Sequence, residues 1–223
     1  MRGTIVNTVA IVIGGSLGIL LGNRLAERFK KIAMQGLSLA VLLLGFKMAL
    51  GTESPVYIIF ALLLGGLIGE GINIEKKLKQ LARWFESLLS NQGQIAEGFV
   101  QCSLIYCVGA MAIMGAIQDG LQQDPSILYA KSLLDGFSAV AFASTLGIGV
   151  VLSAIPVFVY QGIITLLAAQ VTVILTSAVI TEMTAVGGLL IFAIGLNLLE
   201  ITEIKVGNLL PAIAVVIFLV YLF

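Results

Sequence analysis

Long apolar stretches recur along this chain, and they constrain its fold more than any other feature. Each is about 20 residues long, the length that a helix needs to cross ~30 Å of hydrocarbon. They lie at residues 3–22, 32–51, 55–72, 95–117, 133–152, 155–176, 184–199 and 206–223. The expected fold is therefore an all-α polytopic membrane helix bundle of about eight spans.

The amino-acid composition also indicates a membrane protein. Of the 223 residues, 59% are hydrophobic and 11% are charged, whereas an ordinary soluble domain has about 45–50% apolar and ~25% charged residues. Eight spans leave only short loops and no room for a soluble domain. We therefore expect residues 1–223 to form a single membrane domain, with the lipid bilayer as its first partner.

Charge and histidine content exclude several classes of function. Twelve Lys and Arg balance twelve Asp and Glu, so no nucleic-acid partner is expected. The chain has no histidine, which excludes histidine-dependent nucleophilic catalysis and His-ligated zinc or haem. Cys102 and Cys107 lie in an apolar stretch and are expected to be buried structural thiols. We expect no enzymatic activity, no metal site and no cofactor other than Na⁺ or H⁺ as a coupling ion.

Basic residues predict the orientation in the membrane. Residues 23–31 hold four Lys or Arg, and Lys76, Lys77, Lys79 and Arg83 follow the third stretch. By the positive-inside rule both segments face the cytoplasm, and both chain ends lie outside. The first stretch has no A-x-A cleavage site and a basic run after it, so we expect it to be retained rather than removed as a signal peptide.

Residues 73–90 are expected to form a cytoplasmic amphipathic helix between two halves of the chain. Apolar residues recur there with helical spacing, and most charged residues fall on the other side. The helix would lie flat in the headgroup layer or pack on the cytoplasmic ends of the bundle, and the pattern favours neither alternative. At residues 153–156 the fifth and sixth stretches meet either in a tight hairpin or as one long broken helix.

Small residues mark places where spans can approach closely. Gly14, Gly18 and Gly22 form one stripe, Gly65 and Gly69 a second. A third stripe consists of Ala139, Ala143 and Gly147. Such stripes let helix backbones pack tightly in lipid, where no hydrophobic force drives helices together.

Two weak echoes indicate an internal duplication. At a constant offset of 150 the matched pairs are Leu39 with Leu189, Gly45 with Gly195, Thr52 with Thr202 and Glu53 with Glu203. A second echo joins residues 3–7 to residues 115–119. In the expected topology the matched spans run in opposite directions, which makes an inverted repeat with broken helices, the build of many secondary transporters. Chance similarity in so apolar a chain is the alternative.

Polar residues inside the stretches are the candidate functional residues, since a charge in the bilayer costs at least about 2.5–3.5 kcal/mol. Asp135 could ligate Na⁺ or take a proton, or it could simply pair with Lys131 four residues earlier. Five further residues could line a shared polar cavity if the bundle brings their helices together: Asn7, Gln118, Asp119, Gln161 and Asn197. Turn chemistry and interhelical hydrogen bonds are the structural alternatives. Glu70 and Glu182 are expected at the membrane interface.

Five motifs occur in an order that resembles a known family. They are Gly3-Thr4-Ile5-Val6-Asn7, Gly115-Ala116-Ile117-Gln118-Asp119-Gly120, Lys131-Ser132-Leu133-Leu134-Asp135-Gly136, Tyr160-Gln161-Gly162 and Gly195-Leu196-Asn197-Leu198-Leu199. The chain resembles, over its whole length, the YqgA-like family of bacterial inner-membrane proteins, catalogued as domain of unknown function 554. The resemblance implies a multi-pass protein of the bacterial plasma (inner) membrane and brings no established substrate or reaction.

The expected function is a secondary transporter of a small solute or ion, coupled to Na⁺ or H⁺ through Asp135. A channel or passive pore is the nearest alternative, and a non-transporting membrane scaffold or accessory subunit is the other. A scaffold would dock its partner through the basic residues 76–83. A chain of this size has few helices with which to shield a polar path, so the sequence is also consistent with a homodimer.

Overall fold

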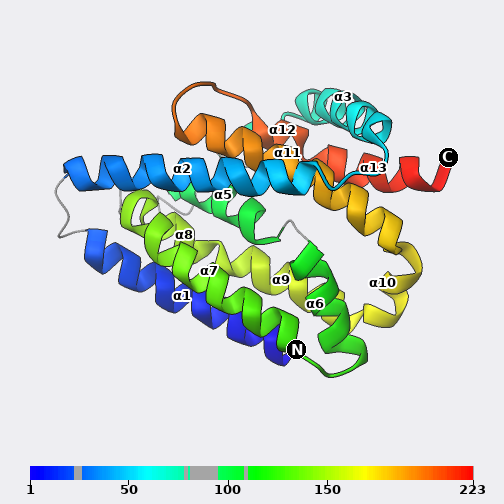
Figure 1. Ribbon diagram of the computed structural model, residues 1–223, viewed down its shortest axis with the longest axis horizontal. Coiled ribbons are helices and arrows are strands. Elements are labelled where there is room, and N and C mark those ends of the chain that lie inside the picture. Colours follow the sequence, from blue (N-terminus) through cyan, green and yellow to red (C-terminus); the bar gives the residue numbers. More distant parts are fainter. Residues whose placement is uncertain (23–26, 78–79, 81–94, 108–109, 223) are drawn as a thin grey trace. The chain divides into compact units, whose positions relative to one another are not determined.

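The computed structural model describes residues 1–22, 27–77, 80, 95–107 and 110–222, and these residues form helices and no strand. The all-α fold expected from the sequence is therefore confirmed. The helices group into two compact units that interleave along the sequence (Figure 1). Unit 1 consists of Met1–Leu37 and Ala82–Ile174, and unit 2 of Ser38–Leu81 and Leu175–Phe223.

Unit 1 is built around two parallel helices in close contact. Its elements are α1 (Arg2–Gly22), the first part of α2 (Glu27–Ala49), α5 (Ile95–Cys107), α6 (Ala110–Leu121), α7 (Ser126–Leu146), α8 (Ile148–Leu152), α9 (Ala154–Leu166) and α10 (Ala168–Ile174). Helices α1 and α7 lie side by side (Figure 1). A Cβ atom placed on Gly14, Gly18 or Gly22 would meet the backbone of α7. The first small-residue stripe is thus a packing seam, as its spacing predicts.

The chain turns at Gly147, between α7 and α8. This residue has φ 67° and ψ −147°, and α9 then runs antiparallel to α1, with Thr165 beside Thr4 and Gln161 beside Asn7. The tight hairpin, one of the two alternatives for residues 153–156, is therefore wrong. A broken helix, the other alternative, is closer to what is observed: Ile148–Leu166 is one apolar stretch, divided at Ser153 into α8 and α9. Ser153 keeps helical dihedrals, and Pro156 lies in the first turn of α9, where a proline needs no N–H.

Gly147→Ala is expected to destabilise the protein by about 1–3 kcal/mol, because a side chain is strained in this backbone region. The matched control is Gly71→Ala, since Gly71 lies in helix α3 (Pro55–Ile72) and has open space where a Cβ would be added. Thermal unfolding of the detergent-purified variants measures both effects. Equal stability of the two variants would contradict the strained turn.

Unit 2 contains two antiparallel helix contacts. Its elements are α2 from Ser38 onward, α3, α11 (Ser177–Leu198), α12 (Val206–Leu209) and α13 (Pro211–Leu222). A Cβ on Gly45 of α2 would meet Phe192 of α11, and a Cβ on Gly195 would meet Leu42. The second stripe also packs closely, since a Cβ on Gly65 would meet Ala212 and one on Gly69 would meet Asn208.

The segments matched by the 150-residue offset lie together in unit 2. Under that offset Leu42 corresponds to Phe192, and Gly45 to Gly195. The contact of Gly45 with Phe192 and the contact of Gly195 with Leu42 are therefore reciprocal, as a two-fold axis would make them. An inverted repeat remains a prediction that this geometry supports.

The expected count of eight spans is not confirmed. Four stretches of described helix are long and apolar enough to cross a membrane: α1, α3, Ile148–Leu166 and α11. A fifth is obtained if α5 and α6, which meet at a bend of 59°, form one broken span. The second expected span begins earlier, at Glu27, and the seventh at Ser177. The last is divided into α12 and α13, because Pro211 follows the break.

Parts of two predictions fall outside the described residues. One part is residues 23–26 of the basic run. The other is most of the amphipathic helix expected at residues 73–90. Asn73, expected to begin that helix, is the left-handed C-cap of α3 with φ 61°. The membrane orientation and the amphipathic helix therefore stay predictions.

Candidate functional site

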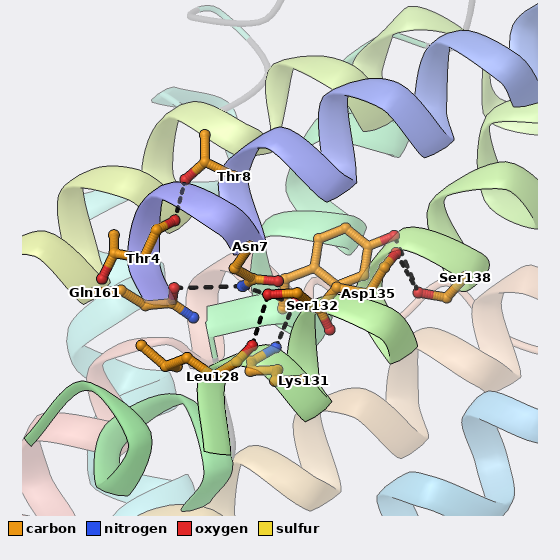
Figure 2. Close-up of polar contacts among 10 residues, drawn as sticks. Thr4, Asn7, Thr8, Leu128, Lys131, Ser132, Asp135, Ser138 and Gln161 are labelled. Carbon is orange, nitrogen blue, oxygen red and sulfur yellow. Dashed lines mark hydrogen bonds and ion pairs between the residues drawn. The ribbon is translucent and has the colours of Figure 1, made fainter. Parts of the chain in front are cut away.

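Four buried polar side chains meet in unit 1, where α1, α7 and α9 come together (Figure 2). Asn7 and Gln161 have no exposed surface, and Lys131 and Asp135 are each 6% exposed. We call these four residues the polar cluster. Such groups are found in an apolar interior only when hydrogen bonds or ion pairs compensate for lost solvent.

Helix geometry places each member of the polar cluster. Asp135 is near the middle of α7, a helix of 21 residues, and Lys131 lies one turn earlier on the same face. Asn7 projects from the face of α1 that also carries Thr4. Gln161 comes from α9, on the antiparallel side of α1.

An ion pair and two hydrogen bonds connect the polar cluster. Lys131 Nζ lies 2.5 Å from Asp135 Oδ2. The amide nitrogen of Asn7 donates to the same carboxylate oxygen at 3.0 Å and to Gln161 Oε1 at 3.3 Å. Figure 2 shows Asn7 between Gln161 and Asp135, so α1 links the other two helices through one side chain.

Two atoms of the polar cluster lack a hydrogen-bond partner among the described residues. They are Oδ1 of Asn7, an acceptor, and Nε2 of Gln161, a donor, and both are buried. Leaving such a group unpaired costs about 1–3 kcal/mol. Unsatisfied groups of this kind are rare in folded proteins, and a bound water, an ion or a functional role usually explains them.

Further polar residues flank the cluster, and of these Thr4, Thr165 and Tyr106 were not among the candidates expected from the sequence. Thr4 and Thr165 form a hydroxyl contact of 3.3 Å one turn away. Ser138 donates to the phenol oxygen of the fully buried Tyr106 at 3.4 Å, and Lys131 Nζ lies 5.9 Å from the centre of that ring. The spacing of Thr4 and Asn7, three residues apart on one helix face, was the available signal.

Gln118 and Asp119, although expected in the shared cavity, bond elsewhere. The carboxylate of Asp119 accepts from the backbone N–H of Gly3 at 3.0 Å and pairs with the amino group of Met1 at 2.8 Å. Gln118 donates to Asp124 in the loop between α6 and α7. The pKa of Asp124 lies below its usual value because Ser126 and Gln118 donate hydrogen bonds to it.

Asn197 belongs to unit 2 and holds a loop. Its Oδ1 accepts from the backbone N–H of Ile204 at 2.9 Å and from the hydroxyl of Thr202 at 3.0 Å. Its amide nitrogen donates to the carbonyl of Ile204 at 2.7 Å. The structure thus brings together three of the six candidate residues, Asn7, Asp135 and Gln161, and gives the other three local partners.

Glu182, expected at the membrane interface, is buried in α11. Its carboxylate accepts from the hydroxyl of Thr52 at 2.6 Å and from the backbone N–H groups of Glu53 and Ser54 at 2.9 and 3.2 Å. It therefore anchors the loop that precedes α3. Glu70 is exposed and pairs with Lys205, and the hydrogen bond to Glu70 raises the pKa of Lys205.

The two thiols are free, and their burial differs. Cys102 is fully buried, as expected, and Cys107 is half-buried.

Comparisons with known proteins show which family the chain belongs to. It matches the family model described as "Protein of unknown function (DUF554)" over residues 2–221. It is 33% identical to "Uncharacterized membrane protein YdfK" of Bacillus subtilis (strain 168), in an alignment that covers 100% of this chain and 98% of that protein. It is 35% identical to "Uncharacterized protein YqgA" of Escherichia coli (strain K12), over 95% of this chain and 92% of that protein. No solved structure matches the chain.

These findings agree with the resemblance carried by the five motifs. The name of the Bacillus subtilis relative and the apolar helices of this chain together support a membrane protein with transmembrane helices. The chain therefore belongs to the family of proteins of unknown function designated DUF554.

Proposed function

We propose that the protein is a multi-pass secondary transporter of the bacterial plasma (inner) membrane. It moves a small solute or ion and couples this movement to Na⁺ or H⁺. It has no enzymatic activity and needs no other cofactor. The observation that carries the proposal is the polar cluster, which combines a buried ion pair with two unsatisfied polar atoms.

The position of Asp135 supports this function. By length alone α7, with 21 residues, could span about 31 Å, close to the thickness of the hydrocarbon core, although it is not among the four described helices that are also apolar enough to do so. If α7 crosses the bilayer, a carboxylate near its middle lies where charged side chains are costly and typically mark ion pathways or proton relays.

The Lys131–Asp135 pair is hard to explain by stability alone. Apolar side chains of similar volume in place of a buried ion pair often leave a protein equally or more stable. A chain with 59% hydrophobic residues has no shortage of such alternatives. The reciprocal contacts within unit 2 add further support, because inverted repeats are common in secondary transporters.

Thermal stability of the purified protein tests this function against Na⁺, K⁺, pH and a panel of small metabolites. A ligand at 100 times its Kd should stabilise the folded protein by about 2.7 kcal/mol. We expect a ligand-dependent rise in Tm whose dependence on Na⁺ or pH is lost in Asp135→Asn. The matched control is Glu200→Gln, which neutralises an exposed carboxylate and should behave like the wild-type protein.

The alternatives give different results. A flat response of the wild-type protein across the panel would favour a scaffold or accessory subunit over a transporter, and absence of gradient-driven uptake as well would contradict the transporter. A channel or passive pore would let its solute equilibrate but would not accumulate it against a gradient.

A further inference from the structure

Charge balance in the polar cluster restricts what can bind there. Lys131 supplies one positive charge and Asp135 one negative charge, and both are buried. The helices packed against α7 include α1, α5, α6 and α8. Their described titratable groups are the Met1 amino group, Arg2, Glu97, Cys102, Tyr106, Cys107 and Asp119, and α9 adds Tyr160. Met1 and Asp119 pair with each other, and Arg2 and Glu97 are exposed. The cluster is therefore electrically neutral.

A cation would be a poor ligand for this arrangement. The ammonium of Lys131 lies 2.5 Å from Asp135 Oδ2 and holds the place that a bound cation would take on that oxygen. A second positive charge beside Lys131 would meet repulsion that the low-dielectric interior screens weakly. This favours the proton over Na⁺ as the coupling ion.

An anion fits better if a proton accompanies it. An anion that reaches Lys131 competes with Asp135 for one ammonium group, and two negative charges beside one positive charge are unfavourable in an apolar interior. Uptake of one proton by Asp135 removes this conflict. The ion pair between Lys131 and Asp135 breaks, and an ion pair between Lys131 and the anion forms. The net charge of the cluster is zero before and after.

The two unsatisfied atoms gain partners in that state. A protonated Asp135 is a hydrogen-bond donor, and the unsatisfied acceptor Asn7 Oδ1 belongs to the amide that already contacts Asp135. Rotation of the Asn7 amide turns this oxygen toward the carboxyl group and gives up the two hydrogen bonds that Nδ2 donates to Asp135 and Gln161. The unsatisfied donor, Gln161 Nε2, is turned away from Asn7 toward the side on which Lys131 lies (Figure 2). It can donate to an anion that Lys131 holds.

We infer that the polar cluster binds one small monovalent anion together with one proton, which makes the protein an anion–proton symporter. The inference rests on the proposed function and names the substrate class and the coupling ion of the same site. Lys131 holds the anion, Gln161 donates a hydrogen bond to it, and Asp135 carries the proton.

Proton movement driven by an anion gradient tests the inference. The full chain is reconstituted into liposomes that contain a pH-sensitive dye, and potassium with valinomycin holds the membrane potential at zero. An inward gradient of chloride, nitrate, formate or L-lactate is then imposed, with protein-free liposomes as the baseline. We expect at least one of these anions to acidify the lumen faster in wild-type proteoliposomes than at baseline.

Two variants separate anion binding from proton coupling. Asp135→Asn replaces the carboxylate with a neutral side chain of nearly the same shape, so it should lose acidification but keep the exchange of labelled for unlabelled anion. Retained exchange also shows that this variant is folded. Lys131→Gln should lose both activities, and Glu200→Gln should keep both.

The possible failures are distinguishable. Acidification by Asp135→Asn at the wild-type rate, or no acidification by the wild-type protein with any of the four anions, would overturn the anion–proton inference. Accumulation of a solute driven by Na⁺ without proton movement would also overturn it, but would leave the proposed transporter intact. Only the absence of any gradient-driven uptake, together with a flat thermal response, would remove both.

Discussion

Lys131→Met is expected to destabilise the protein by about 3–5 kcal/mol, because it leaves a buried charge without its partner. The carboxylate of Asp135 would keep only the hydrogen bond from Asn7 among its described side-chain contacts. Thermal and denaturant unfolding of the detergent-purified variant measure the loss. The control is Lys205→Met, which removes an exposed partner of Glu70 and should cause no measurable loss.

The double variant Lys131→Met/Asp135→Leu should recover most of the lost stability, because two apolar side chains need neither a charge partner nor a hydrogen bond in an apolar interior. It should nevertheless be inactive in transport. A stable, inactive double variant would show that the ion pair serves function rather than folding. A double variant as unstable as Lys131→Met would instead mean that the pair is needed to assemble unit 1.

Gly18→Leu is expected to destabilise the protein by about 3 kcal/mol or more, at the upper end of overpacking effects. A Cβ at this position would meet the carbonyl oxygen of Val140 and the side chain of Ala143. A backbone oxygen cannot rotate away as a flexible side chain can, so α1 and α7 would have to separate along the seam.

Gly36→Leu is the matched control for this variant. Gly36 also lies within a helix, and a Cβ placed there has no atom within 4 Å. Its expected effect on stability is therefore small. If both leucine variants unfolded at the same temperature, the close contact between α1 and α7 would be contradicted.

The helical class and the close-packed seams could be predicted from the sequence, because both depend on local patterns. Apolar length gives helices in lipid, and glycines four residues apart, such as Gly14 and Gly18, form a smooth stripe on one helix face. Helix boundaries were predicted less well. The stretch expected to begin at residue 184 is a helix that begins at Ser177 and includes the buried Glu182. The burial of this carboxylate is possible because Thr52 and two backbone N–H groups donate hydrogen bonds to it. Hydropathy alone does not predict these hydrogen-bond donors, because they come from another part of the chain.

The polar cluster could be predicted only in part. Asp135 and Lys131 are one helical turn apart, so their pairing follows from spacing. Asn7 and Gln161 lie on helices far away in the sequence, and their meeting depends on which helices become neighbours. Asn197 and Gln118 were equally polar candidates, but loop residues close to them in sequence satisfy their amides. Composition cannot distinguish a locally satisfied amide from one that reaches another helix.

Accumulation of a solute against its gradient tests the central claim most directly. Wild-type proteoliposomes receive the ligand that raises Tm most, and an inward proton or Na⁺ gradient is imposed. The proposed transporter predicts that the ligand rises above its external concentration, and that in Asp135→Asn it only equilibrates. Simple equilibration in the wild-type protein, as in a passive pore, or no uptake at all would contradict the claim.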